Sequence, residues 1–240
     1  MKKGLISVIG SCRVYTPLNK ITDSCPFQLN HGQTEWFTHS TRDVIQKIKI
    51  VNTDIALPDS FIPLVINDNK KYNPGTHKEN FYKGTDCYII EISSIQTNRY
   101  AEFELQQWCL RDLKLNPEGN EHIISNLMST HMTEDEILKD LETIYNLLGK
   151  SPILFVSHNM LPKPDGTLPK PRPIIKRALE IFSTQNQDVL FFDPSPTILA
   201  YGVDRAMKDP AHYTKEFEPV IGQAIIDKLL TFDVFKDLKR

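Results

Sequence analysis

The sequence lacks a long apolar run, a strong excess of one charge and a metal-binding pair of cysteines. No stretch approaches the roughly 20 apolar residues of a membrane-spanning helix, so we expect no membrane span. The formal net charge of −2 gives no reason to expect a nucleic-acid partner. The four cysteines are Cys12, Cys25, Cys87 and Cys109, and none of them forms a CxxC pair. This spacing argues against a zinc site, and we expect reduced thiols in a cytoplasmic protein. What is present, 40% hydrophobic and 24% charged residues, is typical of an ordinary globular protein.

Four short apolar runs predict buried strands, and helical patterns alternate with them. The runs are residues 5–9, 87–92, 152–156 and 188–192. Helices are predicted over residues 133–149, 173–182 and 217–230, and residues 43–50 are compatible with a short helix or with a helix that enters a strand. This alternation predicts an α/β protein, a three-layer α/β/α sandwich with a mainly parallel central sheet. We expect one domain over residues 1–240, with irregular insertions near 52–80 and 98–130.

The first apolar run has a second interpretation. Lys2 and Lys3 precede it and Cys12 follows it, as in a bacterial lipoprotein signal that ends at a lipidated cysteine. Counted from Gly4 to Ile9, the stretch is six residues long, which is short against the roughly 7–15 apolar residues of a signal peptide. We therefore interpret it as the first strand.

Polar side chains follow nearly every predicted strand. Ligands of an open parallel sheet bind at the carboxyl ends of its strands, so these residues are expected to converge. The first strand is followed by Ser11 and Arg13, the second by Ser93 and Ser94, and the third by His158 and Asn159. This convergence predicts a functional cleft at that edge of the sheet.

Two segments at opposite ends of the chain suggest a catalytic triad. Ser11, at a predicted strand-to-helix turn, would be the nucleophile, and its backbone N–H near the helix start would stabilise an oxyanion. His212 would be the general base, and Asp209, three residues earlier, would orient the imidazole. Each segment also has an ordinary interpretation, because Gly-Ser pairs form tight turns and an aspartate before proline caps turns.

Other residues leave alternatives open. Cys12 is a rival nucleophile at the same turn, although a small cysteine after a strand is more often buried packing. His158 and Asn159 are either a satisfied polar pair at a strand end or contacts for substrate or oxyanion. The proline-rich basic segment 163–177 is either a stiff solvated loop or a rim over the site that favours an anionic group.

The two end segments resemble the SGNH (GDSL-like) hydrolase superfamily, and within it the GSCFA-type, polysaccharide-modifying branch. The similarity lies in Ile9-Gly10-Ser11-Cys12-Arg13 and in Asp209-Pro210-Ala211-His212, with weaker similarity over residues 153–159 and 165–166. It implies a flavodoxin-like α/β/α sandwich. It also implies a serine esterase or acetyltransferase of a carbohydrate ester, with Ser11, His212 and Asp209 as catalytic residues. Hydrolysis would need no cofactor or metal, whereas a transferase would use acetyl-CoA.

The family's oxyanion residues are less clear in this sequence. Gly32 is the candidate for the oxyanion glycine, and Ser93-Ser94-Ile95-Gln96 stands where Gly-x-Asn-Asp is expected. The hydroxyl of Ser93 or Ser94, or the Asn159 amide, would then substitute, with His158 and Arg13 as further oxyanion or substrate contacts. The expected partner is a small-molecule or carbohydrate acyl ester.

Two other function classes compete with this hypothesis. One is a non-catalytic protein that keeps the fold and uses the cleft to bind a glycan or a nucleotide. The absence of the family's oxyanion asparagine suggests this alternative. A metallophosphoesterase is suggested by Ser157-His158-Asn159, but the sequence lacks the early Asp-x-His and the further ligand clusters that it needs.

Overall fold

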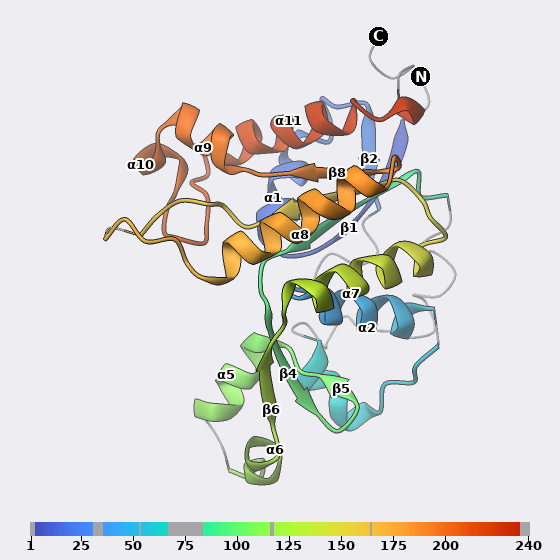
Figure 1. The fold of residues 1–240 in the computed structure, drawn as a ribbon, viewed down its shortest axis with the longest axis vertical. Helices are drawn as coiled ribbons and strands as arrows, with labels where there is room; N and C mark the ends of the chain where they lie inside the picture. Colours follow the sequence, from blue (N-terminus) through green and yellow to red (C-terminus); the bar gives the residue numbers. More distant parts are fainter. Residues whose placement is uncertain are drawn as a thin grey trace.

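A parallel sheet of five strands forms the centre of the molecule. The computed structural model describes residues 3–30, 36–52, 54–66, 84–115, 118–163 and 165–235. The strand order is β2-β1-β3-β7-β8, and every neighbouring pair is parallel (Figure 1). The strands are β1 (Gly4–Ile9), β2 (Phe27–Leu29), β3 (Cys87–Ile92), β7 (Ile153–Ser157) and β8 (Val189–Phe192).

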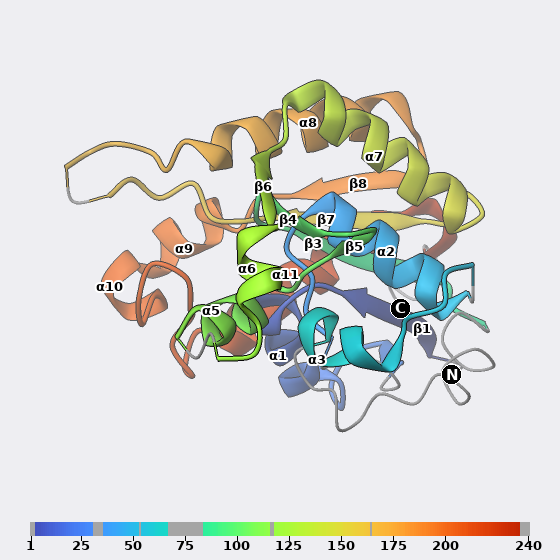
Figure 2. The same ribbon diagram turned by 90° about the horizontal axis from the view of Figure 1, so that it is seen from below.

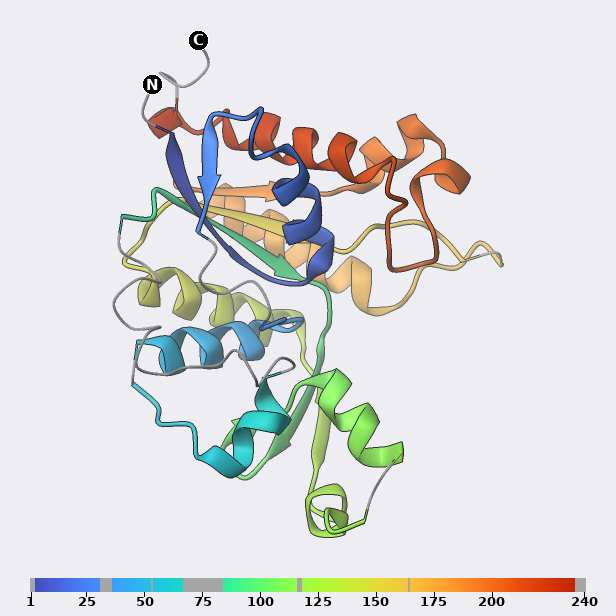
Figure 3. The same cartoon turned by 180° about the vertical axis from the view of Figure 1, so that it is seen from behind.

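Helices cover both faces of this sheet. One face carries α1 (Cys12–Ile21) and α11 (Glu218–Leu229), and the other carries α2 (Thr41–Val51), α7 (Glu134–Leu147) and α8 (Pro171–Gln185) (Figures 1 and 3). Alternate residues of the strands enter the two hydrophobic cores: in β3, Ile89 packs toward α1 and α11, and Ile90 toward α2 and α7. Because both faces are covered, the strands are apolar runs rather than alternating patterns.

The helices on the first face approach each other closely. A Cβ added at Gly222 of α11 would lie 2.6 Å from the carbonyl oxygen of Pro17 in α1, so only glycine allows this contact. On the other face, Thr133 and Glu136 form the expected capping box at the start of α7. Both observations explain how the sequence fixes the positions of helices around the sheet.

A smaller antiparallel sheet projects from one end of the molecule. Its strand order is β5-β4-β6, with β4 (Gln96–Tyr100), β5 (Phe103–Glu104) and β6 (Met128–His131). The helices α5 (Gln107–Leu115) and α6 (Glu121–Ser125) lie between β5 and β6 in the chain, beside this sheet (Figures 1 and 3). The region that the sequence suggests as an irregular insertion near 98–130 thus contains regular elements that face the carboxyl edge of the large sheet.

The remaining elements are short. A 3₁₀ turn at Asp59–Phe61 leads into α3 (Ile62–Val65), and α9 (Ser195–Tyr201) and α10 (Val203–Ala206) precede the loop that carries Asp209 and His212. Figure 2 shows α9 and α10 at the same end of the molecule as α5. None of the described helices is both long and apolar enough to cross a bilayer.

The predicted α/β/α architecture is confirmed. All four predicted strands and all three predicted helices are present, with boundaries shifted by a few residues, and residues 43–50 lie within the helix α2. Within the expected insertion near 52–80, residues 54–66 contain the short elements Asp59–Phe61 and Ile62–Val65, and residues 67–80 lie outside the described residues.

Candidate active site

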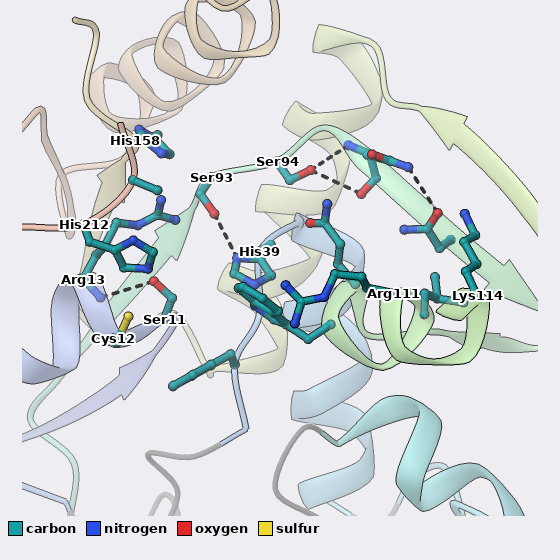
Figure 4. Close-up of a pocket in the computed structure, with 17 residues that line it drawn as sticks. Ser11, Cys12, Arg13, His39, Ser93, Ser94, Arg111, Lys114, His158 and His212 are labelled. Atoms are coloured by element: carbon teal, nitrogen blue, oxygen red, sulfur yellow. Dashed lines mark hydrogen bonds between the residues drawn. The ribbon is translucent and has the colours of Figure 1, made fainter. Parts of the chain in front are cut away.

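A cavity of about 780 Å³ lies between the carboxyl edge of the large sheet and α5 (Figure 4). The strand ends contribute Ser11, Ser93 and His158 to its lining, and the C-terminal loop contributes His212. The volume is typical of a small-molecule site. Arg13 and Ser94 line the cavity as well, so five of the six strand-end residues predicted from the sequence meet in one place.

Ser11 connects the end of β1 to α1. It is the N-cap of α1, and its Oγ accepts the backbone N–H of Arg13 at 3.3 Å. Its side chain is nearly buried, yet it lines the cavity. The start of a helix carries partial positive charge, which favours an oxyanion on or near this side chain.

The backbone N–H of Ser11 has a partner that the sequence does not suggest. It donates to Oε2 of Glu91 in β3 at 2.8 Å, and Oε1 of the same carboxylate accepts from Nε of Arg13 at 2.6 Å. Burial raises the pKa of Glu91, but the Arg13 guanidinium and the hydrogen bonds from Ser11 bring it below its usual value. The carboxylate is therefore charged, and Arg13 is held against it.

Asp209 and His212 form a hydrogen-bonded pair. Nδ1 of His212 lies 2.8 and 2.9 Å from the two carboxylate oxygens of Asp209. Oδ1 of Asp209 also accepts the backbone N–H groups of Ala211 and His212. Burial raises the pKa of Asp209, but these hydrogen bonds, together with the one to the His212 side chain, hold it below its usual value. The aspartate thus both shapes the loop and fixes the imidazole, with the other ring nitrogen left for chemistry.

Asn159 supports this loop from outside the cavity. Its side chain is buried and donates to the carbonyl of Pro210 at 3.4 Å, while its Oδ1 accepts from Arg172 at 2.7 Å. Arg172 donates to the same Pro210 carbonyl at 3.4 Å. Asn159 is absent from the described lining of the cavity, so its amide reaches the site through the loop and not directly. Within the basic segment 163–177, Arg172 is thus tied to the loop of the candidate site.

Ser93 and Ser94 are both held in place by hydrogen bonds to nearby residues. Their backbone N–H groups both donate to the carbonyl of His39, at 2.8 and 3.0 Å. The Ser93 hydroxyl lies 3.2 Å from Nδ1 of His39, whereas the Ser94 hydroxyl accepts the N–H of Gln96. Of the two hydroxyls, only that of Ser93 contacts an imidazole.

His158 lines the cavity as a neutral imidazole. Burial lowers its pKa to about 2, and the positive charges of Arg13 and Arg172 contribute to the shift. Its Nδ1 is buried and has no hydrogen-bond partner in the described part of the chain. A neutral ring here is suited to a hydrogen bond with a ligand, and not to a charge.

Cys12 also lines the cavity, one residue beyond Ser11. Burial and the neighbouring Glu91 carboxylate raise the pKa of its thiol. The thiolate is the nucleophilic form of cysteine, so this environment disfavours Cys12 as the attacking group.

The far wall of the cavity comes from α5. Trp108, Arg111 and Lys114 line it, and the Arg111 guanidinium lies over the Trp108 ring at 4.2 Å from its centre. Gln96 and Asn98 of β4 also line the cavity and add amide groups to it. In the described part of the chain, no group of three His, Cys, Asp or Glu residues is arranged to hold a metal ion.

The sequence interpretation missed Glu91, His39 and the α5 wall. A single charge within the apolar strand 87–92 is the signal that marks Glu91, since a buried carboxylate requires a partner. His39 lies in an irregular segment, and α5 has no polar motif, so neither gave a comparable signal. Gly32, the candidate oxyanion glycine, lies outside the described residues.

Comparisons with known proteins found a sequence relative and several similar solved structures. The chain is 25% identical to the Vi polysaccharide biosynthesis protein TviD of Salmonella typhi over 92% of its own length, but it spans only 31% of that protein. Similar solved structures include a carbohydrate esterase of family 3 from Talaromyces cellulolyticus, with 11% identity, a TM-score of 0.45, and coverage of 98% of this chain and 99% of that one. Another is a predicted SGNH hydrolase from Slackia heliotrinireducens, with 8% identity, a TM-score of 0.47, and coverage of 95% and 99%. We infer no function from these structural similarities.

A family model gives the more specific match. The model described as the TviD N-terminal domain matches residues 5–117 and residues 113–228. Together the two matches include every strand of the large sheet, Ser11, and the Asp209–His212 pair. The chain therefore belongs to the TviD N-terminal domain family.

Proposed function

We propose that this protein is a serine esterase or O-acyltransferase that acts on a small acyl ester, of acetyl type, carried by a carbohydrate. The observation that carries the proposal is the Asp209–His212 pair, whose imidazole shares one cavity with the Ser11 side chain. These are the three parts that activate a serine: a nucleophile, a base and an acid that orients the base.

In the proposed reaction, His212 takes the proton of Ser11 Oγ as that oxygen attacks the acyl carbonyl. Asp209 holds the imidazole by Nδ1 and stabilises the positive charge that the ring acquires. The protonated imidazole then gives its proton to the departing alcohol, which leaves an acyl-Ser11 intermediate. Water completes hydrolysis, or a sugar hydroxyl completes transfer, with His212 again as the base.

The carbohydrate part of the proposal rests on the α5 wall. Trp108 offers an aromatic face, and Gln96, Asn98 and Gln107 offer amides, which together suit a polar ring with an apolar face. The relative from Salmonella typhi carries a polysaccharide biosynthesis name, which supports the same substrate class. An acetyl donor such as acetyl-CoA would be a second substrate, and Arg111 and Lys114 would match its phosphates.

Labelling with a fluorophosphonate probe tests the nucleophile. We expect covalent labelling on Ser11 and not on Cys12, located by mass spectrometry of the peptide, together with turnover of p-nitrophenyl acetate. Ser11→Ala should remove both. Ser183→Ala is the matched control, because Ser183 of α8 is not among the cavity-lining residues and its hydroxyl donates only to the carbonyl of Glu180 among the hydrogen bonds described. A wild-type protein that is inert to the probe and to several acyl donors would contradict the proposal.

A second candidate function is a non-catalytic glycan- or nucleotide-binding protein. One observation favours it: the Ser11 amide, a natural oxyanion donor, is already bound by the Glu91 carboxylate. Isothermal titration with acetylated oligosaccharides and with nucleotides separates the two. Binding that survives Ser11→Ala, without turnover of any ester, would favour the binding protein.

A further inference from the structure

The Ser11 amide is unavailable to an oxyanion because Glu91 holds it. Glu91 is 1% exposed, its carboxylate is charged, and Oε2 accepts the Ser11 N–H at 2.8 Å. The approach depends on Gly10, where a Cβ would come within 2.7 Å of the Cβ of Glu91. The interaction is therefore built into two neighbouring strands.

The amides at the end of β3 are also occupied. The N–H groups of Ser93 and Ser94 both donate to the carbonyl of His39. The backbone N–H groups of Ser11, Ser93 and Ser94 are thus all satisfied within the protein, which directs attention to the side-chain hydroxyls at this edge as oxyanion donors.

The side chain of Ser93 is placed for this task. In the register of the parallel sheet Ile9 lies beside Ile90, so Ser11 and Ser93 follow the ends of adjacent strands, which are separated by about 4.8 Å. Both residues line the cavity, and Figure 4 shows the Ser93 hydroxyl directed toward the His39 ring across from Ser11. The Ser93 Oγ–His39 Nδ1 distance is 3.2 Å.

The tautomer of His39 determines whether the Ser93 hydroxyl proton is available to a ligand. When Nδ1 of His39 carries a proton, it donates to Ser93 Oγ, and the hydroxyl proton is left for a ligand. His39 is itself fixed, since its backbone N–H donates to Asp43 and its carbonyl accepts two N–H groups. A donor that is held in place before the reaction costs no reorganisation when charge develops.

We propose that the Ser93 hydroxyl, held by Nδ1–H of His39, is the oxyanion donor of this site and takes the role that the Glu91-bound amide of Ser11 cannot fill. Ser93 is then a catalytic residue, and His39 is a positioning residue. This inference rests on the proposed acyl-ester chemistry at Ser11.

The test compares kcat and KM for p-nitrophenyl acetate across a set of variants. Ser93→Ala should lower kcat by about 10²–10³ with little change in KM, as expected when one oxyanion donor is lost. Ser93→Thr keeps the hydroxyl and should retain more activity. Ser94→Ala is the matched comparison, because the Ser94 hydroxyl is bound to Gln96 instead of His39, and its loss should be much smaller.

His39 variants separate positioning from folding. His39→Ala should lower kcat, and the double variant with Ser93→Ala should be no slower than Ser93→Ala alone. His39→Asn places an amide N–H near the position of Nδ1 and should restore part of kcat. Thermal unfolding of each variant shows whether the fold is kept.

The outcomes distinguish the two proposals. If Ser11→Ala removes turnover but Ser93→Ala and His39→Ala leave kcat unchanged, the oxyanion assignment is wrong and the nucleophile stands. Additive losses in the double variant would also overturn it. If Ser11→Ala itself leaves turnover unchanged, the proposed function fails first.

Discussion

Arg172 donates to the side-chain oxygen of Asn159 at 2.7 Å, and both side chains donate to the Pro210 carbonyl. Pro210 lies between Asp209 and His212, so these two side chains hold the loop that carries the proposed acid and base. The planar fork of arginine makes contacts with several acceptors that a lysine ammonium cannot reproduce.

Arg172→Lys should therefore lower kcat by about 10- to 100-fold with a smaller effect on KM, because a small displacement of a catalytic group is costly. Steady-state kinetics with p-nitrophenyl acetate measures the split. Arg177→Lys is the charge-matched control, since Arg177 is exposed and pairs with Glu134 on the surface. Equal effects of the two substitutions would show that the Pro210 contacts have no role in positioning.

Asp209→Asn should separate the two roles of that side chain. An asparagine oxygen can still accept the N–H groups of Ala211 and His212, so we expect an unchanged melting temperature. The carboxylate that fixes the His212 tautomer is lost, and kcat should fall by as much as about 10⁴-fold, as for other triad aspartates. Asp165→Asn makes the same chemical change in an exposed turn, where Asp165 binds Thr167, and should not affect turnover.

Gly222→Ala should destabilise the packing of α11 on α1. The added Cβ would lie 2.6 Å from the Pro17 carbonyl oxygen, which is backbone and cannot rotate away. Forcing such a contact costs about 1–3 kcal/mol, seen as a lower urea midpoint. Gln223→Ala, at the adjacent exposed position of α11, is expected to change stability by less than about 0.5 kcal/mol. A Gly222→Ala variant as stable as the wild type would mean that the helices separate without cost.

Glu104 should make stability depend on pH. Burial, and then the charge of Asp43, raises the pKa of Glu104 to about 7 from an ordinary value of 4.5. Between these two values the folded chain holds a proton that the unfolded chain has released, so the free energy of unfolding should fall as pH rises. Urea unfolding of wild type and Glu104→Gln at pH values across this range measures the effect.

The glutamine variant should have a flatter dependence on pH than the wild type. Glu102→Gln, two residues away on an exposed turn, is the matched control. An identical pH dependence in wild type and Glu104→Gln would show that Glu104 titrates alike in the folded and unfolded chains.

The large sheet was predictable because its buried strands are continuous apolar runs. The small sheet was not, because Gln96–Tyr100 is largely polar and all four residues of Met128–His131 are exposed. β2 is only three residues long, which is too short to show the hydrophobic pattern of a strand in the sequence.

For the site, a topological rule was sufficient to place Ser11, Ser93 and His158 at one edge. The same rule does not predict which backbone N–H groups already donate hydrogen bonds within the protein. The Glu91–Ser11 hydrogen bond and the contact between His39 and Ser93 join segments that are distant in the chain, and only the folded structure reveals them.

The position of Ser93 has a mechanical consequence. Residues 93–95 are the link by which β3 of the large sheet continues into β4 of the small one, so Ser93 belongs to the joint between two units of the fold. Any rotation of the small sheet against the large one must be absorbed partly in these three residues. The segment that carries the Ser93 hydroxyl is thus also the chain connection to the sheet beside α5, whose residues line the far wall of the cavity. A ligand that drew α5 inward would strain the same connection that positions that hydroxyl.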